Sequence, residues 1–450
     1  MLCRDQEMPG WGGTGPAMGT SKLMARLANG TITKGEIAAS AGRVLQTMFS
    51  VGLMDMPNGS FAPAKLQANV STAASIASAR SLCAASTVML KNEQGLLPLK
   101  AGKKIAVIGM AQATDAIVAG GGSGSVHPSW HGVSAPLDAI KTHAGSSFTS
   151  FSDGGDINAS ATAAQQADVA IVFVGTFSGE GMDRQSLSLD AGRGTCGKKN
   201  PVRLCHQDAL VAAIAAAQPH TVVVVATPGP VLLPWSGQVA AILTTFMCGE
   251  QIGNAVADIL YGHVNPSARL PLTFPNMENE TQLTPNQWPY TNKSDPNVSF
   301  TERGLFGYRY YDAHNLTFSS GFPFGHGLSF TTFHYSSLKV VPTTTATIAT
   351  HSAANVSLTL TNNGTRAGAE IVQLYLTFPA AAGAPPQHLK GFQKVTLAAG
   401  AQTTVVLPLT ARDLSIWDVD QHAWTVVKGT FGVAVGSSSR DHRLTATLTV

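Results

Sequence analysis

The sequence predicts an α/β domain followed by an all-β domain, and two patterns carry this prediction. Unbroken runs of β-branched and other apolar residues recur between residues 105 and 243, as strands buried on both faces of a parallel sheet require. From about residue 336 apolar and polar residues largely alternate, which is typical of strands buried on one face only. With 450 residues the chain is long enough for two or three domains.

The α/β domain is predicted from four strand-sized runs and three helical stretches between them. The strands are expected at 105–108, 169–174, 221–226 and 240–243, and the helices at 159–167, 206–217 and 253–261. Strands that alternate with helices indicate a mainly parallel sheet with crossover helices on both faces, an α/β/α sandwich.

The segment ahead of this domain is predicted to be helical. Residues 40–51 place Val44, Leu45, Met48 and Val51 on one face of a helix that stops at Gly52. A linker rich in Pro, Gly and Ser follows at 57–63, and a second helix is expected at about 71–85.

The tail is predicted to be a β-sandwich of immunoglobulin or fibronectin type III kind. Alternating strands separated by turn residues are expected at 356–360, 371–376, 404–409 and 431–435. The stretch 276–300 is rich in Asn, Pro and Thr without a periodic pattern, so we predict a long connector there.

The composition argues against some partners and favours a secreted protein. Charged residues make up 12% of the chain and the net charge is +3, so neither nucleic acid nor a membrane is an expected partner. Ten of the seventeen asparagines lie in Asn-x-Ser/Thr sequons, which mark surface loops of secreted glycoproteins. A chance result of the Ser/Thr-rich composition is the alternative. Residues 1–5 do not resemble a signal peptide, so we expect the signal to lie outside this chain.

The five cysteines predict no zinc site, because no CxxC pair is present. Cys196 and Cys205 flank a polar loop and could form a local disulfide in an oxidising compartment, with two free thiols as the alternative. Cys83 lies in an Ala-rich helical stretch and is predicted to be a core residue.

The segment 178–184, Ser-Gly-Glu-Gly-Met-Asp-Arg, is the strongest candidate site. It follows the predicted strand 169–174 directly, and ligands of open parallel sheets bind at the carboxyl ends of strands. The glycines beside Glu180 let the backbone approach a substrate closely. Taken alone, an ordinary charged surface loop is an equally good interpretation.

A series of motifs in one order resembles glycoside hydrolase family 3 over nearly the whole chain. They are DQEMPG at 5–10, STVMLKNEQGLLPL at 86–99, IAVIG at 105–109, GGGSG at 120–124, SGEGMDR at 178–184, PGPVLLPW at 228–235, GNAVADILYG at 253–262, NPSARLPLTF at 265–274, GYRYYD at 307–312, FPFGHGLS at 322–329, LKGF at 389–392, DLSIWD at 413–418 and GSSSRD at 436–441.

This resemblance implies three parts: a (β/α)8-type barrel, an α/β sandwich and a fibronectin type III-like domain. The corresponding segments are 1–60 for the end of the barrel, 61–87 for a linker and helix, 88–275 for the sandwich, 276–335 for the connector and 336–450 for the last domain. The family's active site lies between barrel and sandwich and uses no cofactor or metal.

The resemblance also assigns roles. Glu180 matches the acid/base of the β-glucosidase branch, with Ser178, Asp183 and Arg184 as supports of its loop. The partner nucleophile is an Asp expected upstream of Asp5, and Glu7 is predicted to be structural. A retaining glycosidase needs both carboxyls about 5–5.5 Å apart. The acid needs a raised pKa, so we expect Arg184 to point toward Asp183 instead of Glu180.

Weaker candidates lie in the Gly-rich loop and just after it. Gly122, Ser123, His127 and Trp130 are predicted as cleft-rim residues, although packing is the simpler role for His127 and Trp130. The loop lacks the spacing of a phosphate-binding motif. His326 is predicted to be a buried, hydrogen-bonded side chain near the connector.

The predicted function is retaining hydrolysis of terminal, non-reducing β-D-glucosyl residues, with β-glucosides or oligosaccharides as substrates. This chain would supply Glu180 and lack the Asp nucleophile, so it is expected to be inactive alone. One alternative is a β-xylosidase or α-arabinofuranosidase of the same family. The other is a non-catalytic, truncated remnant that binds carbohydrate.

Overall fold

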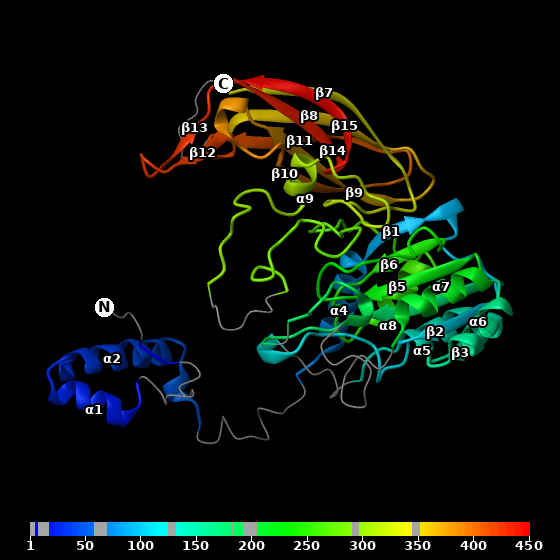
Figure 1. The fold of residues 1–450 in the computed structure, drawn as a ribbon, viewed down its shortest axis with the longest axis horizontal. Coiled ribbons are helices and arrows are strands. Elements are labelled where there is room, and N and C mark those ends of the chain that lie inside the picture. Colours follow the sequence, from blue (N-terminus) through cyan, green and yellow to red (C-terminus); the bar gives the residue numbers. More distant parts are fainter. Residues whose placement is uncertain are drawn as a thin grey trace. The chain divides into compact units, whose positions relative to one another are not determined.

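A computed structural model of the chain describes residues 5–7, 18–57, 70–124, 132–181, 183–191, 205–289, 297–343 and 352–450. The contacts within it divide the chain into two compact units, Met1–Ser71 and Thr72–Val450 (Figure 1). None of the helices in the described part of the chain is both apolar and long enough to cross a membrane.

The first unit consists of helices α1 (Thr20–Ala28) and α2 (Lys34–Ser50) and the short 3-10 helix η1 (Leu53–Asp55). Helix α2 begins earlier than the predicted 40–51, because Thr33 and Glu36 form a capping box that satisfies the first backbone N–H groups. Glu7 accepts a hydrogen bond from the Met18 N–H at 2.7 Å, which is a structural contact.

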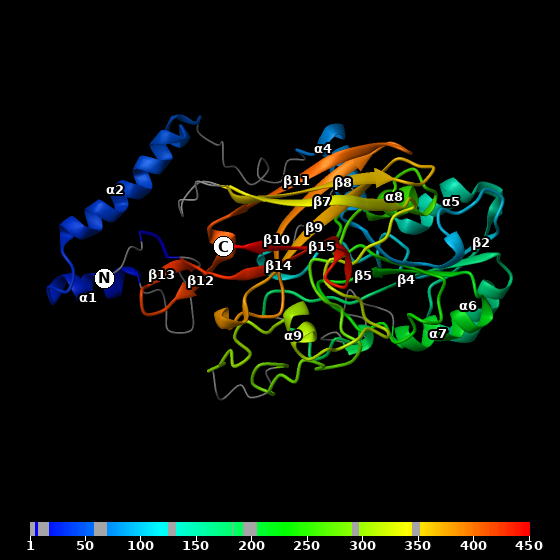
Figure 2. The ribbon, with the colours of Figure 1, turned by 90° about the horizontal axis from the view of Figure 1, so that it is seen from above.

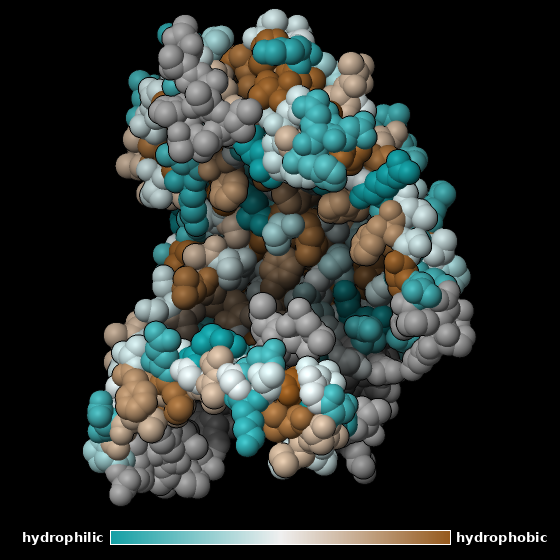
Figure 3. All heavy atoms as spheres, turned by 90° about the vertical axis from the view of Figure 1, so that its left-hand side faces the viewer, coloured by the Kyte–Doolittle hydropathy of each residue, from teal (hydrophilic) through white to brown (hydrophobic). Residues whose placement is uncertain are grey.

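No residue of α1 or α2 is buried. Met24, Leu45, Phe49 and Val51 are among the large apolar side chains that this unit exposes. Brown, apolar patches interrupt the polar surface on the side of the molecule drawn in Figure 3. An amphipathic helix with an uncovered apolar face normally packs against further structure.

The second unit begins with a six-stranded sheet in the order β1-β6-β5-β4-β2-β3. Its strands are β1 (Val88–Asn92), β2 (Ile105–Gly109), β3 (Phe148–Ser152), β4 (Val169–Gly175), β5 (Thr221–Ala226) and β6 (Ala241–Thr244). All neighbouring pairs are parallel except β1 and β6. The predicted fold class, α/β with a mainly parallel sheet followed by an all-β domain, is confirmed.

Five helices accompany this sheet: α4 (Ala73–Ser86), α5 (Pro136–Ala144), α6 (Ile157–Gln165), α7 (Gln207–Ala217) and α8 (Ile252–Leu260). Figure 2 shows α6 and α7 on one side of the strands and α5 and α8 on the other. Successive strand residues point to opposite faces, so Val172 packs in the core under α7 while Ile171 packs in the core under α5 and α8. Helix α4 packs on α8.

A connector with helix α9 (Tyr308–Ala313) leads to the second domain of this unit. Its strands are β7 (Phe333–Pro342), β8 (Ser352–Asn362), β9 (Gly368–Thr377), β10 (His388–Leu397), β11 (Gln402–Thr410), β12 (Ser415–Asp418), β13 (Ala423–Val426), β14 (Thr430–Ser438) and β15 (Asp441–Thr449). Antiparallel sheets β10-β9-β14-β15 and β11-β8-β7 enclose one core, and β12 and β13 form a hairpin. This is the architecture expected of the tail.

Short 3-10 helices occupy several loops of this unit: η2 (Glu93–Gly95), η3 (Gly122–Gly124), η5 (Gly145–Ser147), η6 (Leu189–Ala191), η7 (Ala380–Ala382) and η8 (Arg412–Leu414). The two domains meet at a buried ion pair. Arg269, which follows α8, lies 2.5 Å from Glu370 on β9, and each side chain is 6% exposed.

The cysteines differ from the prediction. Cys83 is buried as expected, but it is disulfide-bonded to Cys248, which lies 165 residues further along the chain. The bond joins α4 to the segment after β6. Cys205 is also disulfide-bonded. Because Cys196 lies outside the described residues, its pairing with Cys205 stays a prediction.

Candidate active site

Glu180 lies on the loop that follows β4, at the carboxyl ends of the parallel strands, where ligands of open α/β sheets bind. A second loop, which contains η3, runs beside it. Gly121 and Gly179 form a parallel bridge, in which the Gly121 N–H donates to the Ser178 carbonyl at 3.1 Å and the Glu180 N–H donates to the Gly121 carbonyl at 3.3 Å. Two segments about sixty residues apart therefore hold Glu180.

The two loops approach so closely that glycine is required. A Cβ on Gly179 would lie 2.6 Å from the Gly121 Cα, and a Cβ on Gly122 would lie 2.3 Å from the Glu180 Cβ. Gly122 also has a φ of +83°, in the region that favours glycine. The Gly-rich loop is thus a scaffold for Glu180, which explains its composition without a phosphate ligand.

Ser123 binds the Glu180 carboxylate. Its backbone N–H lies 2.8 Å from Oε2, and its hydroxyl donates to the same oxygen. The Glu180 side chain is exposed in this chain. The hydroxyl and the N–H of Ser123 lower the pKa of Glu180, since both donors stabilise the ionised form. The raised pKa expected of a catalytic acid is therefore absent from this chain taken by itself.

Arg184 does not adopt the predicted arrangement. Its guanidinium donates to the Pro230 carbonyl at 2.8 Å and interacts electrostatically with Glu278, rather than with Asp183. Burial lowers the pKa of Arg184, and the charge of Glu278 opposes that effect. The prediction that Arg184 points toward Asp183 is therefore wrong, because Arg184 contacts the Pro230 carbonyl and Glu278 instead.

Glu278 was not found by sequence reasoning, although it fixes the same loop. It accepts hydrogen bonds from the Ser186 hydroxyl at 2.6 Å, the Leu187 N–H at 2.8 Å and the Trp288 indole at 2.9 Å. Burial raises the pKa of Glu278, but these donors outweigh burial and hold it below its ordinary value. No local signal marks this contact, because Ser186 and Glu278 are 92 residues apart.

The remaining predicted site residues fall into two groups. Gly122 and Ser123 touch Glu180, and Ser178 joins the loops through its carbonyl. His127 and Trp130 lie outside the described residues. His326 binds the Leu90 carbonyl through Nε2 at 2.8 Å, which agrees with the structural role expected of it.

Comparison with protein families shows the family to which this chain belongs. Residues 87–330 match the glycosyl hydrolase family 3 C-terminal domain, and residues 370–439 match a fibronectin type III-like domain. Because the first match covers more than half of the 450 residues, the chain belongs to glycosyl hydrolase family 3.

Curated relatives carry β-glucosidase names. The "Probable beta-glucosidase L" of Neosartorya fischeri is 35% identical over an alignment that covers 94% of this chain and 60% of the relative. The "Beta-glucosidase cel3A" of Pyricularia oryzae is 34% identical and covers 99% of this chain and 63% of its own length. The chain therefore spans about 60% of these relatives.

Solved structures show the same fold. The β-D-glucoside glucohydrolase of Trichoderma reesei aligns with a TM-score of 0.80 and 31% identity, over 99% of this chain and 65% of that one. DesR, a β-glucosidase from Streptomyces venezuelae solved in complex with D-glucose, aligns with a TM-score of 0.82 and 28% identity, over 99% of this chain and 69% of its own.

Proposed function

We propose that this chain is the acid/base-bearing part of a retaining β-glucosidase that removes terminal, non-reducing β-D-glucosyl residues. The observation that carries the proposal is Glu180, exposed at the carboxyl edge of the sheet on a loop that Gly121, Gly122 and Ser123 hold in place. Membership of glycosyl hydrolase family 3 and the names of the relatives support the substrate class.

In this mechanism Glu180 first donates a proton to the glycosidic oxygen as the bond to the anomeric carbon breaks. A carboxylate nucleophile attacks that carbon and forms a glycosyl-enzyme ester. Glu180, now ionised, takes a proton from water as the water oxygen attacks the anomeric carbon. The bond from that carbon to the nucleophile carboxylate breaks, which frees the sugar. We assign the nucleophile to an Asp of a barrel outside these 450 residues, and Met1–Ser71 to the end of that barrel. The uncovered apolar side chains of α1 and α2 support this assignment.

The protonation of Glu180 would then depend on whether the barrel is docked against this chain. In this chain Ser123 stabilises the ionised carboxylate, which suits the base step but not the acid step. A docked barrel would bury Glu180 and bring a second negative charge close to it. Both effects raise a carboxyl pKa, so the barrel would prepare the acid that this chain positions.

The test is Glu180→Gln in the barrel-containing protein, after the transcript upstream of the Met1 codon has been sequenced. We expect kcat/KM to fall about 10²- to 10⁴-fold for glucosides with poor leaving groups, and much less for dinitrophenyl glucosides, which need little acid assistance. Asp138→Asn, an exposed carboxylate on α5, is the matched control. Equal losses on both substrates would refute the acid/base role.

The same barrel-containing protein also tests which sugar is removed and whether one of the alternative functions applies. A panel of aryl β-glucosides, β-xylosides and α-arabinofuranosides distinguishes a β-glucosidase from the other glycosidases of the family. A stop codon shortly upstream of Met1, together with glucan binding but no turnover, would favour the non-catalytic carbohydrate-binding remnant.

We also propose that the protein is secreted and glycosylated. The disulfide bonds of Cys83 with Cys248 and of Cys205 support an oxidising compartment, because cytosolic thiols are kept reduced. The ten sequons support glycosylation. Peptide-N-glycosidase treatment of the protein from culture medium should lower its apparent mass.

A further inference from the structure

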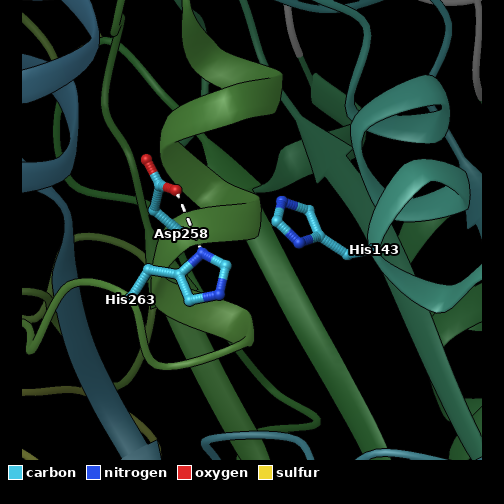
Figure 4. Close-up of side chains that lie close together, drawn as sticks. All are labelled: His143, Asp258 and His263. Carbon is cyan, nitrogen blue, oxygen red and sulfur yellow. Dashed lines mark ion pairs between the residues drawn. The ribbon is translucent and has the colours of Figure 1, made fainter.

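A cluster of three metal-ligating side chains lies away from Glu180. His143 comes from the last turn of α5, Asp258 from the end of α8, and His263 from the segment just after α8 (Figure 4). Their ligand atoms all lie within 4.8 Å of one another. We infer that His143, Asp258 and His263 form a binding site for a divalent transition-metal ion of the zinc and nickel class.

The donor set determines which metals fit. Two imidazoles and one carboxylate suit Zn²⁺ or Ni²⁺, whereas Mg²⁺ and Ca²⁺ prefer sites made of oxygen. The three protein ligands leave a fourth position for water, as in open zinc sites. Metal–nitrogen distances of about 2.0–2.1 Å require the ligands to draw together. The two histidines are exposed.

Asp258 is held as a metal-bound carboxylate usually is. Its side chain is 9% exposed, and Arg80 donates from Nε to Oδ2 and from Nη2 to Oδ1, both at 2.6 Å. These two bonds use about half of the lone-pair positions of a carboxylate, and His263 approaches Oδ1 as well. Hydrogen bonds to a ligating carboxylate fix its orientation. The positive charge of Arg80 opposes a second cation, so we expect binding weaker than that of a closed structural zinc site.

The histidines face Asp258 from two different segments. The Nδ1 atom of His263 lies 3.5 Å from Asp258 Oδ1, and Figure 4 marks this pair. The His143 ring stacks on Tyr261 with 4.9 Å between centroids, and its centroid is 5.0 Å from that of His263. A metal bound here would join the end of α5 to the end of α8.

This cluster belongs to the opposite edge of the sheet from Glu180. Helix α5 leads into β3, so its last turn lies where the parallel strands begin, whereas Glu180 follows the end of β4. The Leu99 N–H, ahead of β2, donates to the Leu260 carbonyl at the end of α8, which places that end at the same edge. The proposed ion would therefore be structural and would not take part in hydrolysis.

The test is calorimetric titration of the purified, metal-free 450-residue chain with ZnCl₂ and NiCl₂, and with MgCl₂ for comparison. We expect about one Zn²⁺ per chain and no detectable Mg²⁺ binding at the same concentrations. His143→Ala and His263→Ala should each weaken Zn²⁺ binding at least about 10-fold, the size of effect typical for a change in a metal site. His334→Ala on β7 removes an exposed imidazole elsewhere and should leave binding unchanged.

A second measurement does not depend on heats of binding. Because a ligand of the folded state stabilises it, Zn²⁺ should raise the Tm of the unaltered chain and of His334→Ala, but not that of the His143→Ala/His263→Ala double variant. An equal Zn²⁺ affinity in the double variant would overturn the proposal, as would the absence of any binding to the unaltered chain. Asp258→Asn is not used, because it also removes the partner of Arg80.

Discussion

At Glu180, one neighbouring residue decides the state of the carboxylate. Ser123 offers an N–H at 2.8 Å and a hydroxyl to the same oxygen, while the rest of the side chain is open to water. In the folded chain the pKa of Glu180 lies below its ordinary value of 4.5. The interaction therefore stabilises the folded state at pH values above the pKa that Glu180 has in the unfolded chain. This stabilisation is lost as the pH falls through the pKa that Glu180 has in the folded chain.

Ser123→Ala should raise the pKa of Glu180 toward 4.5, because it removes the hydroxyl, the larger of the two effects that Ser123 has on this pKa. The measurement is an NMR titration of ¹³C-labelled glutamate carboxyls, with Glu180→Gln used to assign the signal. Ser186→Ala is the matched control, since its hydroxyl donates to Glu278 instead. A Glu180 pKa that stays the same or falls in Ser123→Ala would contradict this assignment.

The helices and strands show which sequence signals are reliable. The buried strands β2, β4, β5 and β6 were predicted to within about one residue, because unbroken apolar runs are needed on a sheet covered from both sides. Edge strand β3, Phe-Thr-Ser-Phe-Ser, carries too few apolar residues to show such a run. Helix α5 was not predicted either; it is only nine residues long and begins at a proline.

The candidate site was predictable where the signal is local and not where it depends on tertiary contact. The short motif that follows a strand marks Glu180 as a candidate, and the resemblance to glycoside hydrolase family 3 adds its acid/base role, which stays a prediction. Three contacts join residues that are 46 to 165 positions apart in the sequence. They are Arg184 with Pro230, Ser186 with Glu278, and Cys83 with Cys248. Only the folded sheet brings such segments together.

Replacing Cys83 and Cys248 together by Ala should destabilise the second unit. The disulfide closes a loop of 165 residues, and losing such a cross-link costs about 2–5 kcal/mol. Urea denaturation followed by circular dichroism measures the change in the free energy of unfolding. Cys83→Ala alone should cost about as much as the double variant, because either change removes the same bond. Unfolding at an unchanged urea concentration would refute a stabilising role.

At the scale of the whole second unit, polar contacts join the α/β domain and the connector after it to the C-terminal β-sandwich. Arg269 and Glu370 form a buried pair, the Asn265 side chain donates to the Ala367 carbonyl at 3.0 Å, and the Gln373 side chain donates to the Gly325 carbonyl at 3.1 Å. Directional contacts of this kind fix how the two domains meet, since buried polar groups must find partners.

Glu370→Gln should destabilise this unit by about 3–5 kcal/mol, because it leaves the Arg269 charge buried without its anion. Urea denaturation gives the free energy of unfolding. The Arg269→Met/Glu370→Leu double variant, which removes both charges, should be more stable than the sum of its single variants implies. Strict additivity of the two changes would show that the pair is not coupled.

The contact between Gly121 and Gly179 also has a genetic consequence. Every amino-acid replacement at either codon adds a Cβ, and at Gly179 that atom would lie 2.6 Å from the Gly121 Cα. Gly122 is under the same restriction because of its closeness to Glu180. The position of one carboxylate thus depends on two distant stretches of the gene, because a missense change at the Gly122 codon or the Gly179 codon adds a Cβ that forces neighbouring atoms to shift.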